Sequence, residues 1–431
     1  MAGEWPIVLV TDLYEIGSGL SKPRSEFGFG TPFVTFKDVL DNYFIPSTPG
    51  SLVNATEKER HACSVKRGDV FLTRTSETQG ELGMSSVALK DFESATFNGF
   101  TKRLRPKAGT ELVPEYVGYY FRGPKFRQAV TAMSSLSTRA SLNNEMIGRL
   151  SITLPPFEIQ RQIGQILKAL DDKIELNRRM NVTLEALAWA LFQSWFVDFD
   201  PVRAKLDGRL VSPLPVKEGQ GVGYPLDPAI APLFPNSFQD SPLGPIPHGW
   251  RAAHLEEIAS VGSGKRPESR CDVLSPECNI PLYGGGGRMG YVPSALYDKP
   301  ILFTGRVGTL GLIFRTAEPS WPSDNTLIVE PQAGNFDFTY FVLKGFDLIT
   351  LNRGSTQPLL TQTDLKRQTF VLPTKDVVKA FADVSEPIFR QMVSNERESR
   401  TLATLRDTLL PKLLSGELSV PHTEQIIGRT I

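Results

Sequence analysis

The stretch WPIVLVTDLYEIGSG at residues 5–19 returns as WRAAHLEEIASVGSG at residues 250–264. With a shift of 245 positions and no gap, both stretches begin on a tryptophan and end on the same Gly-Ser-Gly triplet. Such a repeat predicts that the chain contains two copies of one structural unit.

The far end of each copy repeats as well, but with a shift of 218 positions. Leu154-Pro155 then aligns with Leu372-Pro373, and Thr183-Leu184 aligns with Thr401-Leu402. The two shifts differ by 27 residues, which must lie between the matching ends. Constant ends around a variable interior predict two related modules on one scaffold, each of which recognises something different.

The hydrophobic pattern changes after Leu154. Pro155 and Pro156 stand where the first N–H groups of a helix lack partners, which indicates a helix start. Apolar residues then recur at three- and four-residue spacing in narrow seams typical of a coiled coil. Asn177 and Asn395 interrupt the seams at equivalent places, and they either fix the register of the helix pair or face solvent. The predicted helix-pair core contains Ile163, Leu167, Leu170, Ile174, Asn177, Leu184, Leu191, Phe381, Ile388, Met392, Asn395, Leu402 and Leu409.

These patterns predict an α+β fold, with two globular α/β modules in tandem and a long helix after each. An antiparallel coiled coil with pseudo-two-fold symmetry suits the two helices best, because a modest linker then suffices. The predicted segments are a first module at 1–153, a helix at 154–199, a linker with ten prolines at 200–247, a second module at 248–372, a helix at 373–418 and a tail at 419–431.

Composition places the chain among ordinary globular proteins. Its 431 residues are 40% hydrophobic and 22% charged, which suffices for two or three domains with cores of their own. No apolar run is long enough to cross a bilayer, and the start does not resemble a signal peptide. The three cysteines argue against a disulfide framework and for the cytoplasm, and their spacing does not suit a metal site.

Charge is segregated although the formal net charge is zero. Residues 101–150 contain nine lysines and arginines against three acids. This excess predicts either a positive face for nucleic acid or an ordinary solvated surface.

Longer motifs resemble one family. Leu154–Lys205, which begins LPPFEIQRQIGQILKAL, resembles the central conserved region of the specificity subunits of type I restriction–modification enzymes. TLATLRDTLLPKLLSGEL at Thr401–Leu418 resembles their C-terminal conserved region. Pro245–Pro267 and Pro281–Pro331 resemble the entry and the body of their second target-recognition domain. The match covers most of the chain.

The resemblance implies a DNA-specificity subunit. Each target-recognition domain would bind one half of a bipartite double-stranded DNA site, and the helix pair would set the gap between the halves. Two methyltransferase subunits and the restriction subunits would be the partners that methylate adenine or cleave. This chain would then have no catalytic site and no metal or cofactor, and S-adenosylmethionine, ATP and magnesium would belong to the partners. The alternative is a coiled-coil adaptor without sequence-specific DNA binding.

Three motifs hint at catalysis without completing it. Leu154 precedes Pro155-Pro156-Phe157, where an adenine methyltransferase needs Asn or Asp as a hydrogen-bond acceptor. Around Gly262–Lys265, Arg266 stands where a phosphate loop needs Ser or Thr for magnesium. Asp171-Asp172-Lys173 resembles a nuclease pattern, but it lies on the predicted helix without an acidic partner. A stand-alone methyltransferase or nuclease is therefore disfavoured.

Binding chemistry remains, because Arg, Lys, Asn and Gln can contact base edges or phosphates from loops. We expect Arg306 to contact a base and Lys102 a phosphate. The first module contains extra sequence within Gly28–Lys66 and lacks an evident counterpart of Tyr283–Tyr291. The candidate DNA-binding residues are Arg74, Thr75, Lys102, Arg103, Arg105 and Arg139 in the first module, and Lys265, Arg266, Arg288, Arg306, Arg353 and Gln357 in the second.

An aromatic cluster crowds the end of the first predicted helix. It either closes a core between the helix and a module or forms a docking face for a methyltransferase subunit. Its members are Trp189, Phe192, Trp195, Phe196 and Phe199.

Overall fold

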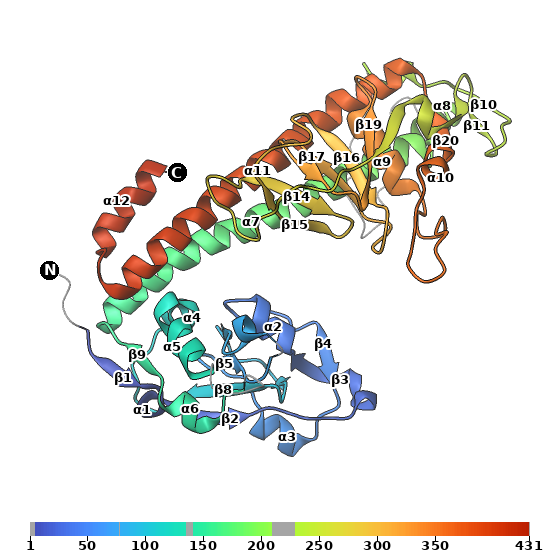
Figure 1. The fold of residues 1–431 in the computed structure, drawn as a ribbon. Coiled ribbons are helices and arrows are strands. Elements are labelled where there is room, and N and C mark those ends of the chain that lie inside the picture. Colours follow the sequence, from blue (N-terminus) through green and yellow to red (C-terminus); the bar gives the residue numbers. More distant parts are fainter. Residues whose placement is uncertain (1–4, 77, 135–140, 209–228, 431) are drawn as a thin grey trace. The chain divides into compact units, whose positions relative to one another are not determined.

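The computed structural model describes residues 5–76, 78–134, 141–208 and 229–430 (Figure 1). The chain divides into two compact units. The first unit holds residues 1–177 together with 397–431, and the second holds residues 178–396. Each unit thus contains one globular module, part of the long helix α7 (Phe157–Phe196) and part of the long helix α11 (Lys375–Ser415). No described helix has the length and apolar character needed to cross a membrane.

The first module is built around two sheets, the larger antiparallel and the smaller mixed. A four-stranded antiparallel sheet has the order β2-β8-β5-β6, and a three-stranded sheet has the order β4-β3-β7. Helices α2 and α3 both begin with a capping box, Thr35 with Asp38 and Thr56 with Glu59, which satisfies their first backbone N–H groups. The strands are β1 (Ile7–Leu9), β2 (Tyr14–Ser18), β3 (Phe27–Val34), β4 (Ser51–Val53), β5 (Val70–Thr73), β6 (Ser85–Val87), β7 (Thr96–Phe97), β8 (Thr101–Pro106) and β9 (Ser151–Thr153), and the helices are α1 (Val10–Leu13), α2 (Phe36–Asp41), α3 (Glu57–Ala62), α4 (Pro114–Arg122), α5 (Pro124–Ser134) and α6 (Asn144–Gly148).

The second module has the same topology. Its four-stranded antiparallel sheet has the order β13-β19-β16-β17, and its three-stranded sheet has the order β15-β14-β18. The strands are β10 (Phe238–Gln239), β11 (Ile246–Pro247), β12 (Arg251–His254), β13 (Ala259–Ser263), β14 (Ile280–Gly284), β15 (Gly287–Val292), β16 (Ile301–Gly305), β17 (Ile313–Thr316), β18 (Trp321–Pro322), β19 (Thr326–Pro331) and β20 (Thr369–Leu372), and the helices are α8 (Asp200–Leu206), α9 (Phe336–Gly345) and α10 (Gln362–Lys366).

Strand register makes the two modules comparable residue by residue. Ser18 pairs with Lys102 in the first module, and Ser263 pairs with Leu327 in the second. On the neighbouring strand Phe71 is equivalent to Phe303, since they pair with Arg103 and Ile328. The shift between the copies is therefore 225 at β8 and β19, a value between those at the two ends of the repeat.

The first module does have a counterpart of the segment around Tyr283, so the sequence-based expectation was wrong. Phe33 and Val34 pair with β7 in parallel, as Leu282 and Tyr283 pair with β18. In the second module a tight turn joins β14 directly to β15, whereas helix α2 separates β3 from β4. The inserted helix hides the equivalence in the sequence.

The repeated Gly-Ser-Gly triplet is a packing requirement. A Cβ atom on Gly19 would lie 2.4 Å from the carbonyl oxygen of Asn98, and one on Gly264 would lie 2.1 Å from that of Ser323. Both distances are too short for any side chain. Glycine recurs there because the chain crosses the turn before β8 or β19 at backbone contact distance.

The long helices pair in an antiparallel sense within each unit. In the first unit Asp171 of α7 accepts a hydrogen bond from Arg406 of α11, and Asn177 donates one to Glu398, so the numbers rise on one helix as they fall on the other. In the second unit Asn181 donates to the carbonyl of Met392. The predicted helices and their antiparallel pairing are confirmed.

The predicted seam residues face the core in most cases. Leu184 is only half-buried, although its repeat partner Leu402 is buried. Four others are partly buried against the cores of the units, namely Ile174, Leu191, Ile388 and Met392. The fully buried members are Ile163, Leu167, Leu170, Asn177, Phe381, Asn395, Leu402 and Leu409.

The seam asparagines do not face solvent. Asn177 donates to Ser399 Oγ at 3.3 Å in the first unit, and Asn395 donates to Asn181 Oδ1 at 2.8 Å in the second. A shift of 218 positions carries Asn177 onto Asn395 and Asn181 onto Ser399. Each unit therefore contains one copy of the same polar contact, which is the register-fixing arrangement.

The segment predicted as a linker is packed at both ends. Val202 of α8, Phe234 and Ile246 are buried in the core of the second unit. Residues 209–228 lie outside the described chain. The aromatic cluster joins the same core, where Phe192 and Phe196 contact Phe338 and Phe381. It therefore closes a core rather than forming a free docking face. The predicted tail forms α12 (Val420–Thr430), whose Val420 is buried in the core of the first unit.

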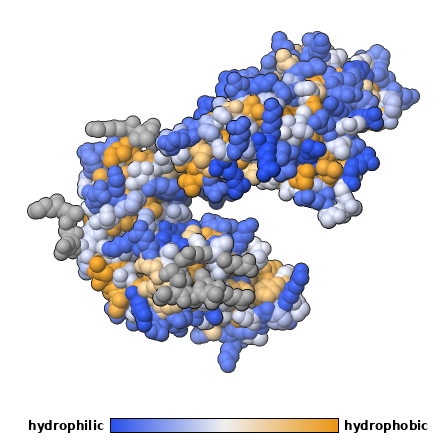
Figure 2. Space-filling model, in the orientation of Figure 1, coloured by the Kyte–Doolittle hydropathy of each residue, from blue (hydrophilic) through white to orange (hydrophobic). Residues whose placement is uncertain are grey.

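A disulfide bond links Cys271 to Cys278, with a Cα–Cα distance of 6.3 Å. The cysteine count argued against a disulfide framework and did not anticipate this single bond. The loop turns back on itself, as Ser275 and Cys278 exchange backbone hydrogen bonds, and this brings the two thiols together. Cys63 is buried and free. On the face drawn in Figure 2, hydrophilic residues cover most of both units, with smaller hydrophobic patches among them.

Candidate nucleic-acid interface

Arg74 and Arg306 occupy the same position in the two modules. Each directly follows one of the two inner strands of its four-stranded sheet, β5 or β16. The N–H of Arg74 donates to the carbonyl of Phe100 at 2.8 Å, and that of Arg306 donates to the carbonyl of Asn325 at 2.8 Å. Two hydrogen bonds thus hold each arginine, because its own carbonyl accepts from Leu142 or Leu360 at 2.8 and 2.9 Å respectively.

The side chains of both arginines are half-exposed and, within the described residues, have no ion-pair partner. A guanidinium on a rigid backbone at the end of a strand can donate to a phosphate or to a base edge. Thr75, the next residue, forms a bridge with Ser141, as Val307 does with Leu359. These equivalent contacts make the end of β5 and the end of β16 the common feature of the two modules.

Lys102 lies near Arg74 and is largely buried, with 8% of its surface exposed. Its Nζ donates to Ser18 Oγ at 2.9 Å. Burial, and then the positive charge of Arg74, lower the pKa of the Lys102 ammonium. In the second module Ser263 Oγ accepts from Gln362 instead, at 2.9 Å. The first module thus has two cations where the second has one cation and an amide.

The other basic residues of the 101–150 segment form hydrogen bonds and ion pairs within the first module. Arg105 forms a bidentate ion pair with Asp69, at 2.8 and 2.6 Å, and Arg103 donates to the carbonyl of Ser64 at 2.7 Å. Arg122 donates to four backbone carbonyls, and burial lowers its pKa to about 10. Every described lysine and arginine of that segment donates at least one internal hydrogen bond, although Lys107, Lys125 and Arg149 remain exposed. These residues are Lys102, Arg103, Arg105, Lys107, Arg122, Lys125, Arg127 and Arg149.

Arg103 and Arg105 consequently have a structural role, which the sequence could not reveal. Their partners lie 36 to 41 residues away in the chain and include backbone carbonyls as well as the side chains of Ser64 and Asp69. Arg139, a further candidate, lies outside the described residues.

The candidate DNA-binding residues of the second module differ in exposure and in whether they form ion pairs. Lys265, Arg266 and Arg288 are exposed, and the Arg288 guanidinium lies 5.2 Å from the ring of Tyr291. Arg353 is exposed but forms a bidentate ion pair with Asp364, at 3.1 and 2.8 Å. Gln357 is exposed in the same loop.

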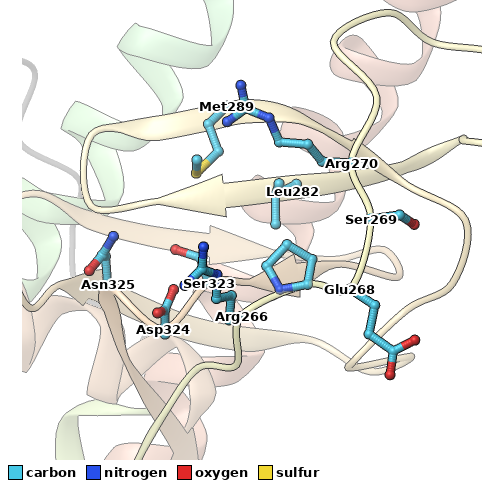
Figure 3. A pocket seen from close by; sticks show the side chains of 10 residues that line it. Arg266, Glu268, Ser269, Arg270, Leu282, Met289, Ser323, Asp324 and Asn325 are labelled. Atoms are coloured by element: carbon cyan, nitrogen blue, oxygen red, sulfur yellow. The ribbon is translucent and has the colours of Figure 1, made fainter.

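A pocket of about 530 Å³ opens beside Arg266 in the second module (Figure 3). Its walls come from three places: the loop between β13 and β14, the strands β14 and β15, and the turn before β19. Arg270 and Asn325 line it as well, although neither was among the candidate residues from the sequence. The turn before β19 was missed because the shift there is 225, between the two shifts visible in the sequence. The lining residues are Arg266, Pro267, Glu268, Ser269, Arg270, Leu282, Met289, Ser323, Asp324 and Asn325.

The described residues contain no group of three His, Cys, Asp or Glu side chains placed to hold a metal ion. The available groups at the ends of β5 and β16 are cations, amides and hydroxyls. Such donors suit the recognition of an anion or of base edges. The fold and these surfaces together define a tandem recognition protein, with two modules of one topology on an antiparallel helix pair.

Known proteins share this organisation. The pattern of the type I restriction modification DNA specificity domain matches residues 3–186 and 247–399, which is most of the chain. The MjaIX specificity subunit of a type I restriction enzyme from Methanocaldococcus jannaschii is 25% identical, with 97% of this chain and 94% of the relative aligned. The HindI specificity subunit from Haemophilus influenzae is also 25% identical, over 90% of this chain and 94% of the relative.

A solved structure supports the fold. The type I restriction–modification S subunit from M. genitalium aligns with a TM-score of 0.52 and 15% identity, over 95% of this chain and 96% of that chain. The protein belongs to the type I restriction modification DNA specificity family.

Proposed function

We propose that this protein is the DNA-specificity subunit of a type I restriction–modification complex and that it binds a bipartite target. The observation that carries the proposal is the repetition of one module topology, with Arg74 and Arg306 in the same backbone setting. Each module binds one half of the target, and the helix pair sets the unspecified gap. The family membership favours this function over a coiled-coil adaptor.

The chemistry belongs to the partners under this proposal. Two methyltransferase subunits bind S-adenosylmethionine and methylate adenine, and restriction subunits bind ATP and magnesium. The specificity subunit itself catalyses nothing and binds no metal or cofactor. Its place of action is the cytoplasm, where these partners meet DNA.

The test uses the protein in complex with its methyltransferase partner. We expect the complex to methylate and protect two short sequence elements separated by an unspecified gap, and we expect its DNA affinity to fall steeply as salt rises. Methylome sequencing of the host, with and without this chain, identifies the site. Contiguous methylated motifs that depend on this chain would contradict the bipartite target. An affinity independent of salt would favour the adaptor instead.

A further inference from the structure

A short turn precedes strand β8 in the first module and strand β19 in the second. We name Asn98–Phe100 and Ser323–Asn325 the entry turns. In both, the threonine that follows donates twice to the carbonyl of the first turn residue, from its N–H at 3.0 Å and from its Oγ1 at 2.7 Å. The two turns therefore have the same closing hydrogen bonds, with the same lengths.

The entry turns are also tied to the neighbouring strands in the same way. The N–H of Asn98 donates to the carbonyl of Val34 at 3.0 Å, and that of Ser323 donates to the carbonyl of Tyr283 at 2.8 Å. The third turn residue accepts the hydrogen bond from the equivalent arginine described above. Each turn is thus a rigid platform with little freedom left to lose on binding.

The side chains differ at all three positions, with Asn98-Gly99-Phe100 in one turn and Ser323-Asp324-Asn325 in the other. The third position lies next to the arginine, because its carbonyl accepts the hydrogen bond from the arginine N–H. Phe100 is 63% exposed, which is unusual for a large aromatic side chain on a rigid turn. Its equivalent, Asn325, is exposed, and within the described residues its amide has no hydrogen-bond partner. In Figure 3 Asn325 lies beside Asp324 at the edge of the pocket formed with Arg266. One platform therefore presents an apolar ring, and the other presents an amide beside the exposed carboxylate of Asp324.

We propose that this third position determines which base each module accepts, an inference that rests on the proposed DNA-binding function. Asn325 donates to and accepts from an adenine edge in the major groove, where Asn forms a bidentate pair with N6 and N7. Phe100 makes an apolar contact with the methyl group of a thymine. An exposed side chain that differs between two turns with the same backbone hydrogen bonds is suited to recognise what differs between two half-sites.

The two equivalent arginines are expected to contact DNA without distinguishing bases. Arg74 and Arg306 are the same residue in the same setting, so they contact what every half-site shares, the phosphate backbone. This assignment replaces the expectation from the sequence that Arg306 reads a base.

The experiment measures binding of the complex with its methyltransferase partner to a library of DNA duplexes. We expect Asn325→Ala to relax one base position in one half-site, with discrimination reduced roughly 5- to 100-fold. Phe100→Ala should relax one position in the other half-site only. The untouched half-site is an internal control within each variant, and thermal melting verifies that both variants fold.

Two control variants make the same types of substitution at residues outside the entry turns. Phe29→Ala removes an exposed phenylalanine of the first module, and Asn335→Ala removes an asparagine beyond the opposite end of β19. Both should leave the preferred sequence unchanged. Arg74→Ala and Arg306→Ala should each weaken binding to all duplexes alike and lower the salt slope by about one.

The outcomes distinguish the role of the third turn position from the proposed DNA-specificity function. If the wild-type complex prefers a bipartite site but Phe100→Ala and Asn325→Ala leave its base preferences unchanged, this inference is overturned and the proposed function stands. If the wild-type complex prefers no bipartite site, both are overturned. Loss of base preference in both half-sites from either single variant would also contradict the assignment of one position to one half.

Discussion

Gly262 and Gly264 lie two residues apart in one motif, but only Gly264 is crowded by backbone. A Cβ atom on Gly264 would lie 2.1 Å from a carbonyl oxygen, whereas one on Gly262 would meet no atom within 4 Å. We expect Gly264→Ala to lower the free energy of unfolding by about 1–3 kcal/mol or more, because the strand must move away from the entry turn. Gly262→Ala is the matched control and should change it by far less. Chemical denaturation measures both, and equal effects would contradict the packing argument.

The ion pair between Arg105 and buried Asp69 is a second residue-level contribution to stability. The Asp69 side chain is fully buried, and Arg105 covers it with two hydrogen bonds. Arg105→Ala leaves a buried carboxylate without its ion-pair partner and, among the described residues, with only the N–H of Lys66 as a donor, so we expect a loss of about 3–5 kcal/mol in the free energy of unfolding. Base preference at the DNA should not change. A variant of normal stability with altered base preference would restore Arg105 as a DNA-binding residue.

Helix α9 is tied to α7 by Glu185 in the second unit. Glu185 accepts hydrogen bonds from Tyr340 and Lys344. Burial alone would raise the pKa of Glu185, but these two donors hold it below the ordinary value of a glutamate. A lowered folded-state pKa adds stability above the unfolded-state pKa of about 4.3, and this stability is lost as the pH falls through the folded-state value.

We therefore expect the free energy of unfolding of the wild type to fall more steeply below pH ~5 than that of Glu185→Gln. Glu256→Gln is the control, since exposed Glu256 has no ion pair among the described residues of the second module. Urea denaturation at several pH values gives the comparison. Parallel pH curves for the wild type and Glu185→Gln would show that the tie contributes nothing that depends on protonation.

The helix pair is also held by polar contacts between α7 and α11. Asn395 is 3% exposed, receives a hydrogen bond from Gln391 and donates one to Asn181. Asn395→Ala removes a buried amide and leaves the half-buried Asn181 without this donor, which should cost about 1 kcal/mol of unfolding free energy. Asn177→Ala, the repeat-related change, should have a similar cost. An unchanged denaturation midpoint for both would indicate that water replaces these contacts without loss.

For the whole molecule, the helix pair is proposed to set the gap in the DNA target. Seven residues inserted at equivalent points of α7 and α11 preserve the seam and add about 10 Å of helix. We expect the gap to lengthen by roughly three base pairs, while both half-sites keep their sequence. Methylome sequencing of the host measures the gap. An unchanged gap would show that something other than the helix length sets the spacing.

Much of this organisation was predictable from the sequence, because periodicity and repetition are local properties. Pro155 and Pro156 gave the start of α7, the seam gave the helix pair, and the two shifts gave two modules with a variable interior. The repeated asparagines were predictable as equivalent positions. Their burial was not, because it depends on which residues of the partner helix lie opposite them.

The candidate site was less predictable, because a cation in the sequence does not reveal its partners. Arg74 and Arg105 are both strand-associated arginines, yet the side chain of Arg74 has no ion-pair partner among the described residues, whereas that of Arg105 covers a buried aspartate. Likewise, the match of Phe100 with Asn325 follows from strand pairing and has no trace in either visible shift. The sequence by itself determined the two modules, their helices and their family, since these depend on near neighbours in the chain. Only the tertiary structure decided which side chains remain free to meet DNA, since that depends on contacts between residues far apart.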